Sequence, residues 1–289
     1  MDGAAIDRIT DRVLASLAQD AVTAPAVVFL LRRYRDTDRA DVGEALGVAL
    51  ARALEQCPAA SNVDERAGWL IALVDAAAIS GDERLRVAAA DLTSALEHEW
   101  GRAVEVETLM RSIDACLVAI QVFEPRTLVQ RALDELERVV AAAYRPGEGM
   151  ADLTAGLPAR GRLADQIRSA AALLTAYSLT GRLPYSMLAE ELTQFSLRTL
   201  WDAGRGGFYE DAARLAKPFA LNCEATRVLC RLAALHLDDD YRHVGIIAPD
   251  ADYAGAAGRI LESQTAQLDD PGCDEALFGL TLDEWLHLP

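Results

Sequence analysis

"GRLADQIRSAAALLTAYSLTGRLPYSMLAEELTQFSLRTLWDAGRGGFYEDA", residues 161–212, contains two helical patterns separated by a short break. Apolar residues recur three and four positions apart from Leu163 to Tyr177 and again from Leu188 to Phe195, which places them on one face of each helix. The break, TGRLP, offers a glycine that can end the first helix and a proline that can begin the second. The stretch therefore predicts a helical hairpin.

The same arrangement recurs along the chain. Further breaks, SGD at 80–82, FEP at 123–125 and LDDD at 237–240, each lie between two helical patterns. The expected helices span residues 4–19, 24–35, 40–56, 63–79, 83–100, 104–122, 126–144, 162–180, 185–201, 218–236, 251–267 and 272–286. Twelve helices make six hairpins, which predict an all-α, (α/α)6 toroid formed by one domain over residues 1–289. An open superhelical stack of hairpins is the alternative.

Composition favours helices and excludes several classes of partner. Apolar residues make up 52% of the chain and aromatic residues only 6%, and much of the apolar share is alanine and leucine, which favour helix over sheet. The net charge of −17 repels nucleic acid and anionic membranes. The longest strongly apolar run, residues 26–31, is far shorter than the roughly 20 residues needed to span a bilayer. The acidic, amphipathic first twenty residues differ from a signal peptide, so we expect a cytoplasmic protein.

The cysteines and histidines indicate no metal centre. The five cysteines form no C-x-x-C pair, and the histidines form no H-E-x-x-H motif. Scattered cysteines of odd number are typical of reduced, buried thiols. The sequence therefore predicts neither a metal nor another cofactor.

Three motifs in residues 128–289 carry a resemblance to a known family. They are Asp165-Gln166 at the start of one helix, W-D-x-x-x-G-G-F from Trp201 to Phe208, and Pro218 with Asn222 before Cys223. This part resembles the helical region of the spermatogenesis-associated, thioredoxin-domain-containing family, with Cys223 in place of a small serine. Residues 1–127 form the more divergent hairpins, and the family's thioredoxin-like domain has no counterpart in the chain.

The resemblance implies a toroid similar to six-hairpin glycosidases and N-acylglucosamine 2-epimerases. In such a ring the inner helices begin at one mouth, so residues in their first turns converge there. Carboxylates stand at several of these expected starts: Asp64, Glu65, Glu105, Glu107, Asp165, Glu224, Asp274 and Glu275. We predict Asp165 and Glu224 as the acid and base of a sugar-active site. The alternative is that these acids only complement the positive ends of the helices.

Ligand-binding residues are predicted around that pair. Gln166 and Asn222 are expected to position hydroxyl groups, and Arg168 either clamps an acidic group or pairs with Asp165 three positions earlier. Stacking faces for a sugar are expected from four aromatic residues, which otherwise belong to the core: Trp69, Tyr177, Phe208 and Tyr209.

Three functions follow from these patterns. The first is a toroid that binds a small, carbohydrate-like ligand or a protein partner, such as a separately encoded thioredoxin-like protein. The second is a carbohydrate-active hydrolase or sugar epimerase, and the third is an open helical scaffold for interactions. The glycine-rich stretch at 204–207 is no phosphate loop, because Lys217 lies ten residues past Gly207 and is followed by proline; we interpret it as a junction between repeats beside the mouth.

Overall fold

A computed structural model describes residues 3–17, 22–101, 105–123, 126–153, 159–268 and 273–289. The predicted helix residues 18–19, 104 and 272, and residues 124–125 of the FEP break, lie outside this part. Within it, thirteen α-helices are present, and each of the twelve predicted helices overlaps one of them. Their bounds are α1 Gly3–Leu17, α2 Ala24–Thr37, α3 Ala40–Gln56, α4 Val63–Ser80, α5 Glu83–Glu97, α6 Val106–Phe123, α7 Arg126–Ala143, α8 Leu163–Thr180, α9 Leu183–Thr199, α10 Phe219–Leu237, α11 Asp239–Val244, α12 Tyr253–Thr265 and α13 Glu275–Leu286.

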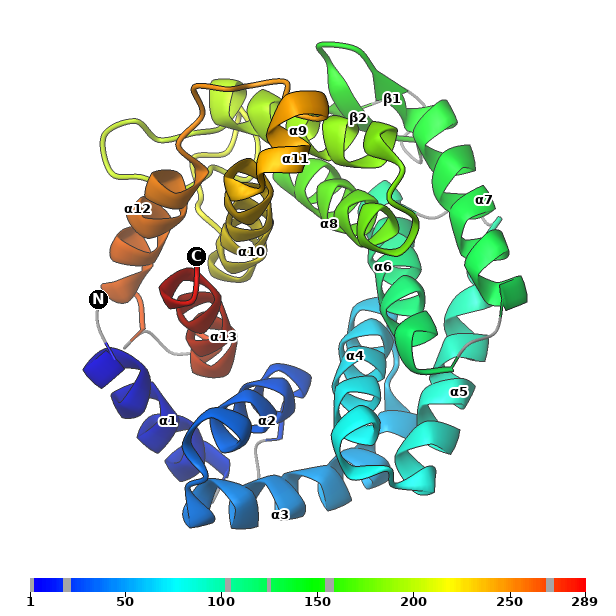
Figure 1. The fold of residues 1–289 in the computed structure, drawn as a ribbon, viewed down its shortest axis with the longest axis vertical. Coiled ribbons are helices and arrows are strands. Elements are labelled where there is room, and N and C mark those ends of the chain that lie inside the picture. Colours follow the sequence, from blue (N-terminus) through cyan, green and yellow to red (C-terminus); the bar gives the residue numbers. More distant parts are fainter. Residues whose placement is uncertain (1–2, 18–21, 102–104, 124–125, 154–158, 269–272) are drawn as a thin grey trace.

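The helices form two concentric rings (Figure 1). The inner ring runs α2, α4, α6, α8, α10 and α13, and each of these packs on the next. The outer ring consists of α1, α3, α5, α7, α9 and α12, each packed against an inner helix. Because α13 packs on both α1 and α2, the first and last hairpins touch and the ring closes. The structure confirms the predicted (α/α)6 toroid and excludes the open stack.

The closure depends on a glycine in α13. A Cβ atom at Gly279 would lie 2.7 Å from Cε2 of Phe29 and 3.0 Å from Cγ2 of Ile9, closer than side-chain packing allows. Phe29 is fully buried at this seam between α2 and α13. The absence of a side chain at Gly279 thus lets the last inner helix approach the first.

The break TGRLP ends and begins its helices as predicted. Gly181 follows α8 with a φ of 66° and donates its N–H to the carbonyl of Tyr177, and Pro184 lies in the first turn of α9. A left-handed residue at this position closes the last turn of a helix, and glycine adopts it without steric cost.

Two parts of the structure differ from the prediction. A three-stranded antiparallel sheet, formed by β1 Tyr144–Arg145, β2 Gly149–Asp152 and β3 Ala159–Arg160, stands where helix and loop were expected. The six-residue α11 and the single-turn 3-10 helix at Cys57–Ala59 are also additional. Elements this short contain too few residues for periodicity to reveal them.

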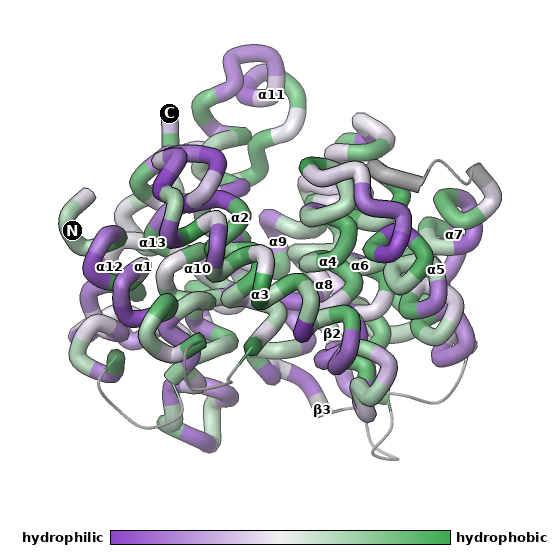
Figure 2. The backbone as a smooth tube through the Cα atoms, turned by 90° about the horizontal axis from the view of Figure 1, so that it is seen from below, coloured by the Kyte–Doolittle hydropathy of each residue, from purple (hydrophilic) through white to green (hydrophobic). Residues whose placement is uncertain are grey.

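The inner helices run parallel, so the ring has two different ends. Figure 2 shows β3 at one end of the ring axis and α11 with the C-terminus at the other. We call these the N-terminal and the C-terminal mouth, after the ends of the inner helices that they adjoin. In the described part of the chain, no helix is both long and apolar enough to cross a membrane.

Candidate functional site: the lumen of the toroid

Cavities follow the axis of the ring. One, of about 500 Å³, is lined by the first turns of α2 and α4 and by residues of α13, and another, of about 260 Å³, lies among the middle turns of the inner helices. The two share Arg32, Ile71, Asp75, Arg111 and Arg227, so they adjoin one another. A third cavity, of about 410 Å³ toward the C-terminal mouth, shares Arg32, Arg231 and Glu284 with the middle one. Together they form the lumen.

Charged residues face the lumen at helical spacing. On α6, Arg111 and Asp114 line it, and Glu107 precedes Arg111 by one turn; on α10, Glu224 and Arg227 line it. Residues three and four apart share one face of a helix, so α6 and α10 each carry a polar stripe on an otherwise buried surface. The stripes converge because the inner ring is closed.

Arg168 lies among carboxylates toward the N-terminal mouth. Its Nε is 3.2 Å from Oε2 of Glu224, and its Nη1 is 3.1 Å from Oδ1 of Asp64 and 3.6 Å from Oε2 of Glu107. The predicted alternative, in which Arg168 pairs with Asp165, is wrong. Its guanidinium reaches α4, α6 and α10 across the lumen, whereas Asp165 is buried beside Glu107 and Arg162.

Two carboxylates on this guanidinium have opposite pKa shifts. Burial acts to raise the pKa of Glu224, but the charges of Arg111, Arg168 and Arg227 outweigh it and hold the pKa below its usual value. Burial raises the pKa of Glu107, and Arg168 and Arg162 offset this only in part. A pair of carboxyls whose pKa values are driven apart is what acid and base catalysis needs.

Deeper in the lumen, most charges are paired. Arg227 donates to both oxygens of Glu284, at 2.9 Å each, and Arg32 donates to Oε1 of Glu284 at 2.8 Å. Arg231 donates to Oγ1 of Thr175 at 3.2 Å. Such charge-assisted bonds fix the side chains around the cavity.

Asp165 is fully buried and lines none of the three cavities. Burial raises its pKa to about 7, against the opposing charge of Arg162 and with a further contribution from Glu107. Within the described residues, neither of its carboxyl oxygens accepts a hydrogen bond from a side chain, and the backbone N–H of Glu107 lowers its pKa only in part. Its pKa suits a general acid, and it lies beside Glu107, which shares the guanidinium of Arg168 with Glu224, its predicted partner.

Gln166 and Asn222 bind backbone groups instead of the lumen. The Gln166 amide accepts from Met150 N–H at 2.8 Å and donates to Met150 C=O at 3.0 Å. The Asn222 amide does the same with Phe208, at 2.7 and 3.0 Å. Each amide therefore attaches a segment beside the N-terminal mouth to the first turns of an inner helix.

The aromatic residues are distributed differently from the prediction. Trp69 lines the 500 Å³ cavity. Phe208 is fully buried with its ring 5.0 Å from that of Trp201, and Tyr177 packs edge-on against Tyr241.

Tyr209 borders a separate surface cavity of about 760 Å³ beside α12. There Lys217 lies over the Tyr209 ring, at 5.3 Å from its centroid, and binds Asp202 and the carbonyl of Gly206 at 2.6 Å each. The glycine-rich stretch is thus held together by its own lysine, which agrees with its interpretation as a junction between repeats.

Of the predicted residues, the structure brings Glu224, Arg168 and Trp69 to the lumen. Sequence reasoning missed Asp75, Arg111, Arg227, Arg231 and Glu284. The signal was present, because a charged residue every third or fourth position in a helix surrounded by helices indicates an internal polar surface. No cluster of metal-ligating side chains that could hold an ion occurs among the residues described.

The similarity of this chain to known proteins is one of fold. No protein-family model and no curated protein matches the sequence. Among solved structures, a D-mannose isomerase superposes with a TM-score of 0.67 at 13% identity, covering 91% of this chain and 86% of that one.

Two other enzymes superpose comparably. An unsaturated glucuronyl hydrolase from Bacillus sp. GL1 gives a TM-score of 0.66 at 12% identity, covering 92% and 84% of the two chains. A sugar epimerase from a ruminal bacterium gives 0.64 at 11%, covering 86% and 75%. This chain is similar in fold to these α/α-toroid enzymes of sugar chemistry, and the more specific resemblance to the spermatogenesis-associated family stays a prediction.

Proposed function

We propose that the protein binds a small, carbohydrate-like ligand in the lumen of its toroid. The observation that carries this proposal is the pair of adjoining cavities whose shared lining includes Asp75 and Arg111. Neither of these two charged side chains makes a hydrogen bond or ion pair within the described chain. Sugars are recognised by a few convergent polar groups beside an apolar surface, and Trp69 and Ile71 supply that surface.

The solved structures of similar fold support the proposal. They include a mannose isomerase, a glucuronyl hydrolase and a sugar epimerase, and the name of each states that it acts on a sugar. The thioredoxin-like partner and the cytoplasmic location stay predictions from the sequence.

Filling the lumen tests the binding proposal. Ala171 lines the 260 Å³ cavity, so Ala171→Trp should block it, whereas Ala90→Trp places the same side chain on the exposed face of α5. A sugar at a hundredfold excess over its Kd should stabilise the parent protein by about 2.7 kcal/mol, which is about 4 °C in Tm for a chain of this length.

The measurement is thermal unfolding with a panel of monosaccharides and disaccharides. The parent protein and Ala90→Trp should show the same shift, and Ala171→Trp should show none. Equal shifts in all three proteins would place the ligand outside the lumen and contradict the proposal.

A second candidate function is a carbohydrate-active hydrolase or sugar epimerase. The opposite pKa shifts of Glu107 and Glu224 around Arg168 favour it. In this proposal Glu224 acts as the base, as predicted. The acid is either Asp165, as predicted, or Glu107, which lies beside Glu224 on the same guanidinium.

Glu224→Gln tests this function, because the amide keeps a hydrogen-bond acceptor for Arg168 but cannot accept a proton at neutral pH. With any sugar that binds, turnover should fall by about 10²-fold or more while the Kd changes little. Progress is followed by NMR, which detects both hydrolysis and isomerisation. Glu44→Gln, on the exposed outer face of α3, is the control, and full turnover in Glu224→Gln would exclude this carboxylate.

A further inference from the structure

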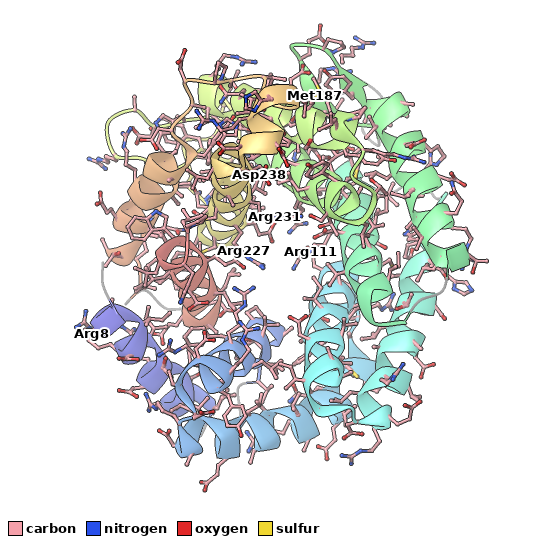
Figure 3. The ribbon with its side chains drawn as sticks, viewed as in Figure 1. Arg8, Arg111, Met187, Arg227, Arg231 and Asp238 are labelled. Atoms are coloured by element: carbon pink, nitrogen blue, oxygen red, sulfur yellow. The ribbon has the colours of Figure 1, made fainter. Side chains whose placement is uncertain are left out.

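Arginines gather in the lumen of a strongly acidic protein. The middle cavity is lined by five of them, Arg32, Arg111, Arg168, Arg227 and Arg231, against four carboxylates, Asp75, Asp114, Glu224 and Glu284. In a chain with a net charge of −17, this is a local reversal of sign. Figure 3 shows Arg111, from α6, and Arg227 and Arg231, from α10, pointing into the central opening.

Four of these arginines bind other groups within the described chain, and Arg111 does not. Arg168 is held by Glu224, Asp64 and Glu107, and Arg32 and Arg227 share Glu284. Arg231 donates to Thr175, whose hydroxyl donates in turn to Asp114 at 2.6 Å.

For Arg111 no ion pair or hydrogen bond exists within the described residues, and its Nε is buried without a partner. Leaving a buried charged donor unsatisfied is unfavourable, and a bound anion is one way in which such a donor is satisfied.

We propose that Arg111, facing Arg227 and Arg231 across the lumen, forms a subsite for the carboxylate or phosphate group of an anionic, carbohydrate-like ligand. This inference rests on the proposed function and names the class of its ligand. A guanidinium presents its N–H donors in a planar fork that matches the oxygens of a carboxylate or phosphate. Arg227 and Arg231 each spend only part of their five donors on protein acceptors.

A neighbouring group fits the remainder of such a ligand. Asp75 lines the same two cavities as Arg111 and, like it, makes no hydrogen bond or ion pair with the described residues. Its carboxyl can bind sugar hydroxyls in either protonation state, and burial raises its pKa against the opposing charges of Arg32 and Arg227. The subsite therefore offers a charged clamp for the anionic group and a hydroxyl-binding group beside it.

The test compares Arg111→Met with Arg8→Met in the full chain. Methionine keeps much of the length of the side chain and removes its charge. Arg111 has no ion pair within the described residues, so its loss breaks none there, and Glu224, whose pKa the charge of Arg111 lowers, keeps its ion pair with Arg168. Arg8 is an exposed arginine of α1 that points away from the ring (Figure 3). Binding of D-glucose, D-glucuronate, D-glucose 6-phosphate and inorganic phosphate is measured by calorimetry at pH 7 in low salt.

We expect glucuronate or glucose 6-phosphate to bind at least tenfold more tightly than glucose. Arg111→Met should abolish that preference, and Arg8→Met should keep it. Glucuronate and glucose 6-phosphate separate a carboxylate from a phosphate as the recognised group.

Four results would contradict the anion subsite, the carbohydrate ligand or both. Glucose binding as tightly as its anionic counterparts, or an unchanged preference in Arg111→Met, overturns the anion subsite and leaves the sugar site standing. Binding of inorganic phosphate alone, lost in Arg111→Met, supports the subsite and contradicts a carbohydrate ligand. No binding of any probe overturns the inference.

Discussion

At pH 8, the Asp165→Asn variant is expected to be more stable to urea than the parent protein, by up to about 4 kcal/mol. Burial raises the pKa of Asp165 from 3.8 to about 7, so the folded state holds its proton more tightly than the unfolded state does. The contribution of Asp165 to the free energy of unfolding is fully present below pH 3.8. It falls by about 1.36 kcal/mol per pH unit as the pH rises toward 7. Asparagine does not titrate and avoids the loss.

The measurement is a series of urea titrations between pH 4 and pH 8. The difference between the two proteins should be near zero at pH 4, grow up to pH 7 and then stay constant. Asp91→Asn, an exposed position on α5, should match the parent protein throughout. A variant that is less stable than the parent at every pH would mean that the ionised Asp165 carboxylate makes favourable contacts in the folded protein.

The same experiment bears on the predicted catalytic role of Asp165. A residue kept ionisable at a cost in stability is typical of functional sites, where strain in the folded protein is retained for activity. If Asp165→Asn gains stability and loses turnover of a bound sugar, its predicted role as acid is supported. If it gains stability and keeps full turnover, Glu107 is the better acid.

The hairpins of the fold could be predicted from the sequence because their signals are local. Leu163 to Tyr177 show a helical period over four turns, and Gly181 ends the helix by a conformation that glycine alone adopts easily. Ring closure could not be predicted in this way, because it involves the contact of Gly279 with Phe29, which are 250 residues apart in the sequence. Periodicity within one helix carries no information on such a contact, so the open stack stayed an alternative.

The site was harder to predict, because the direction of each side chain determines whether a residue reaches the lumen. Asp165 and Arg168 share the first turns of α8, yet one is buried beside α6 and the other reaches the lumen. Gln166 and Asn222 match the sequence pattern of the family, and their amides pair with the backbone of Met150 and Phe208. A motif residue can thus serve the fold that surrounds a site, and sequence alone does not tell these two roles apart.

Arg168→Met is expected to destabilise the protein by about 3–5 kcal/mol at pH 8, because it leaves partly buried carboxylates facing one another without a cation. Glu224 and Glu107 carry this effect, since their side chains are only 16% and 15% exposed, whereas that of Asp64 is 53% exposed. Arg168→Lys keeps the charge and should therefore lose less stability than Arg168→Met. It should still be less stable than the parent protein, because a single ammonium cannot replace the guanidinium fork at several carboxylates.

The pH dependence separates this effect from simple loss of packing. In the parent protein, the lowered pKa of Glu224 adds stability above the unfolded pKa of a glutamate, and this is lost as the pH falls through the lower, folded value. Without Arg168 that contribution shrinks to what Arg111 and Arg227 supply. The deficit of Arg168→Met should therefore be largest at pH 7–8 and shrink toward pH 4, whereas a cavity effect would be the same at every pH.

The double variant Arg168→Met/Glu224→Gln tests whether Arg168 stabilises the protein through its interaction with Glu224. If Arg168 acts chiefly by balancing Glu224, neutralising that carboxylate should return a large part of the lost stability, and the coupling energy of the cycle should exceed about 1 kcal/mol. Additive losses would instead mean that Arg168 stabilises the mouth through its hydrocarbon stem. In that case the carboxylates are balanced by other charges of the lumen, foremost Arg111, whose charge already lowers the pKa of Glu224.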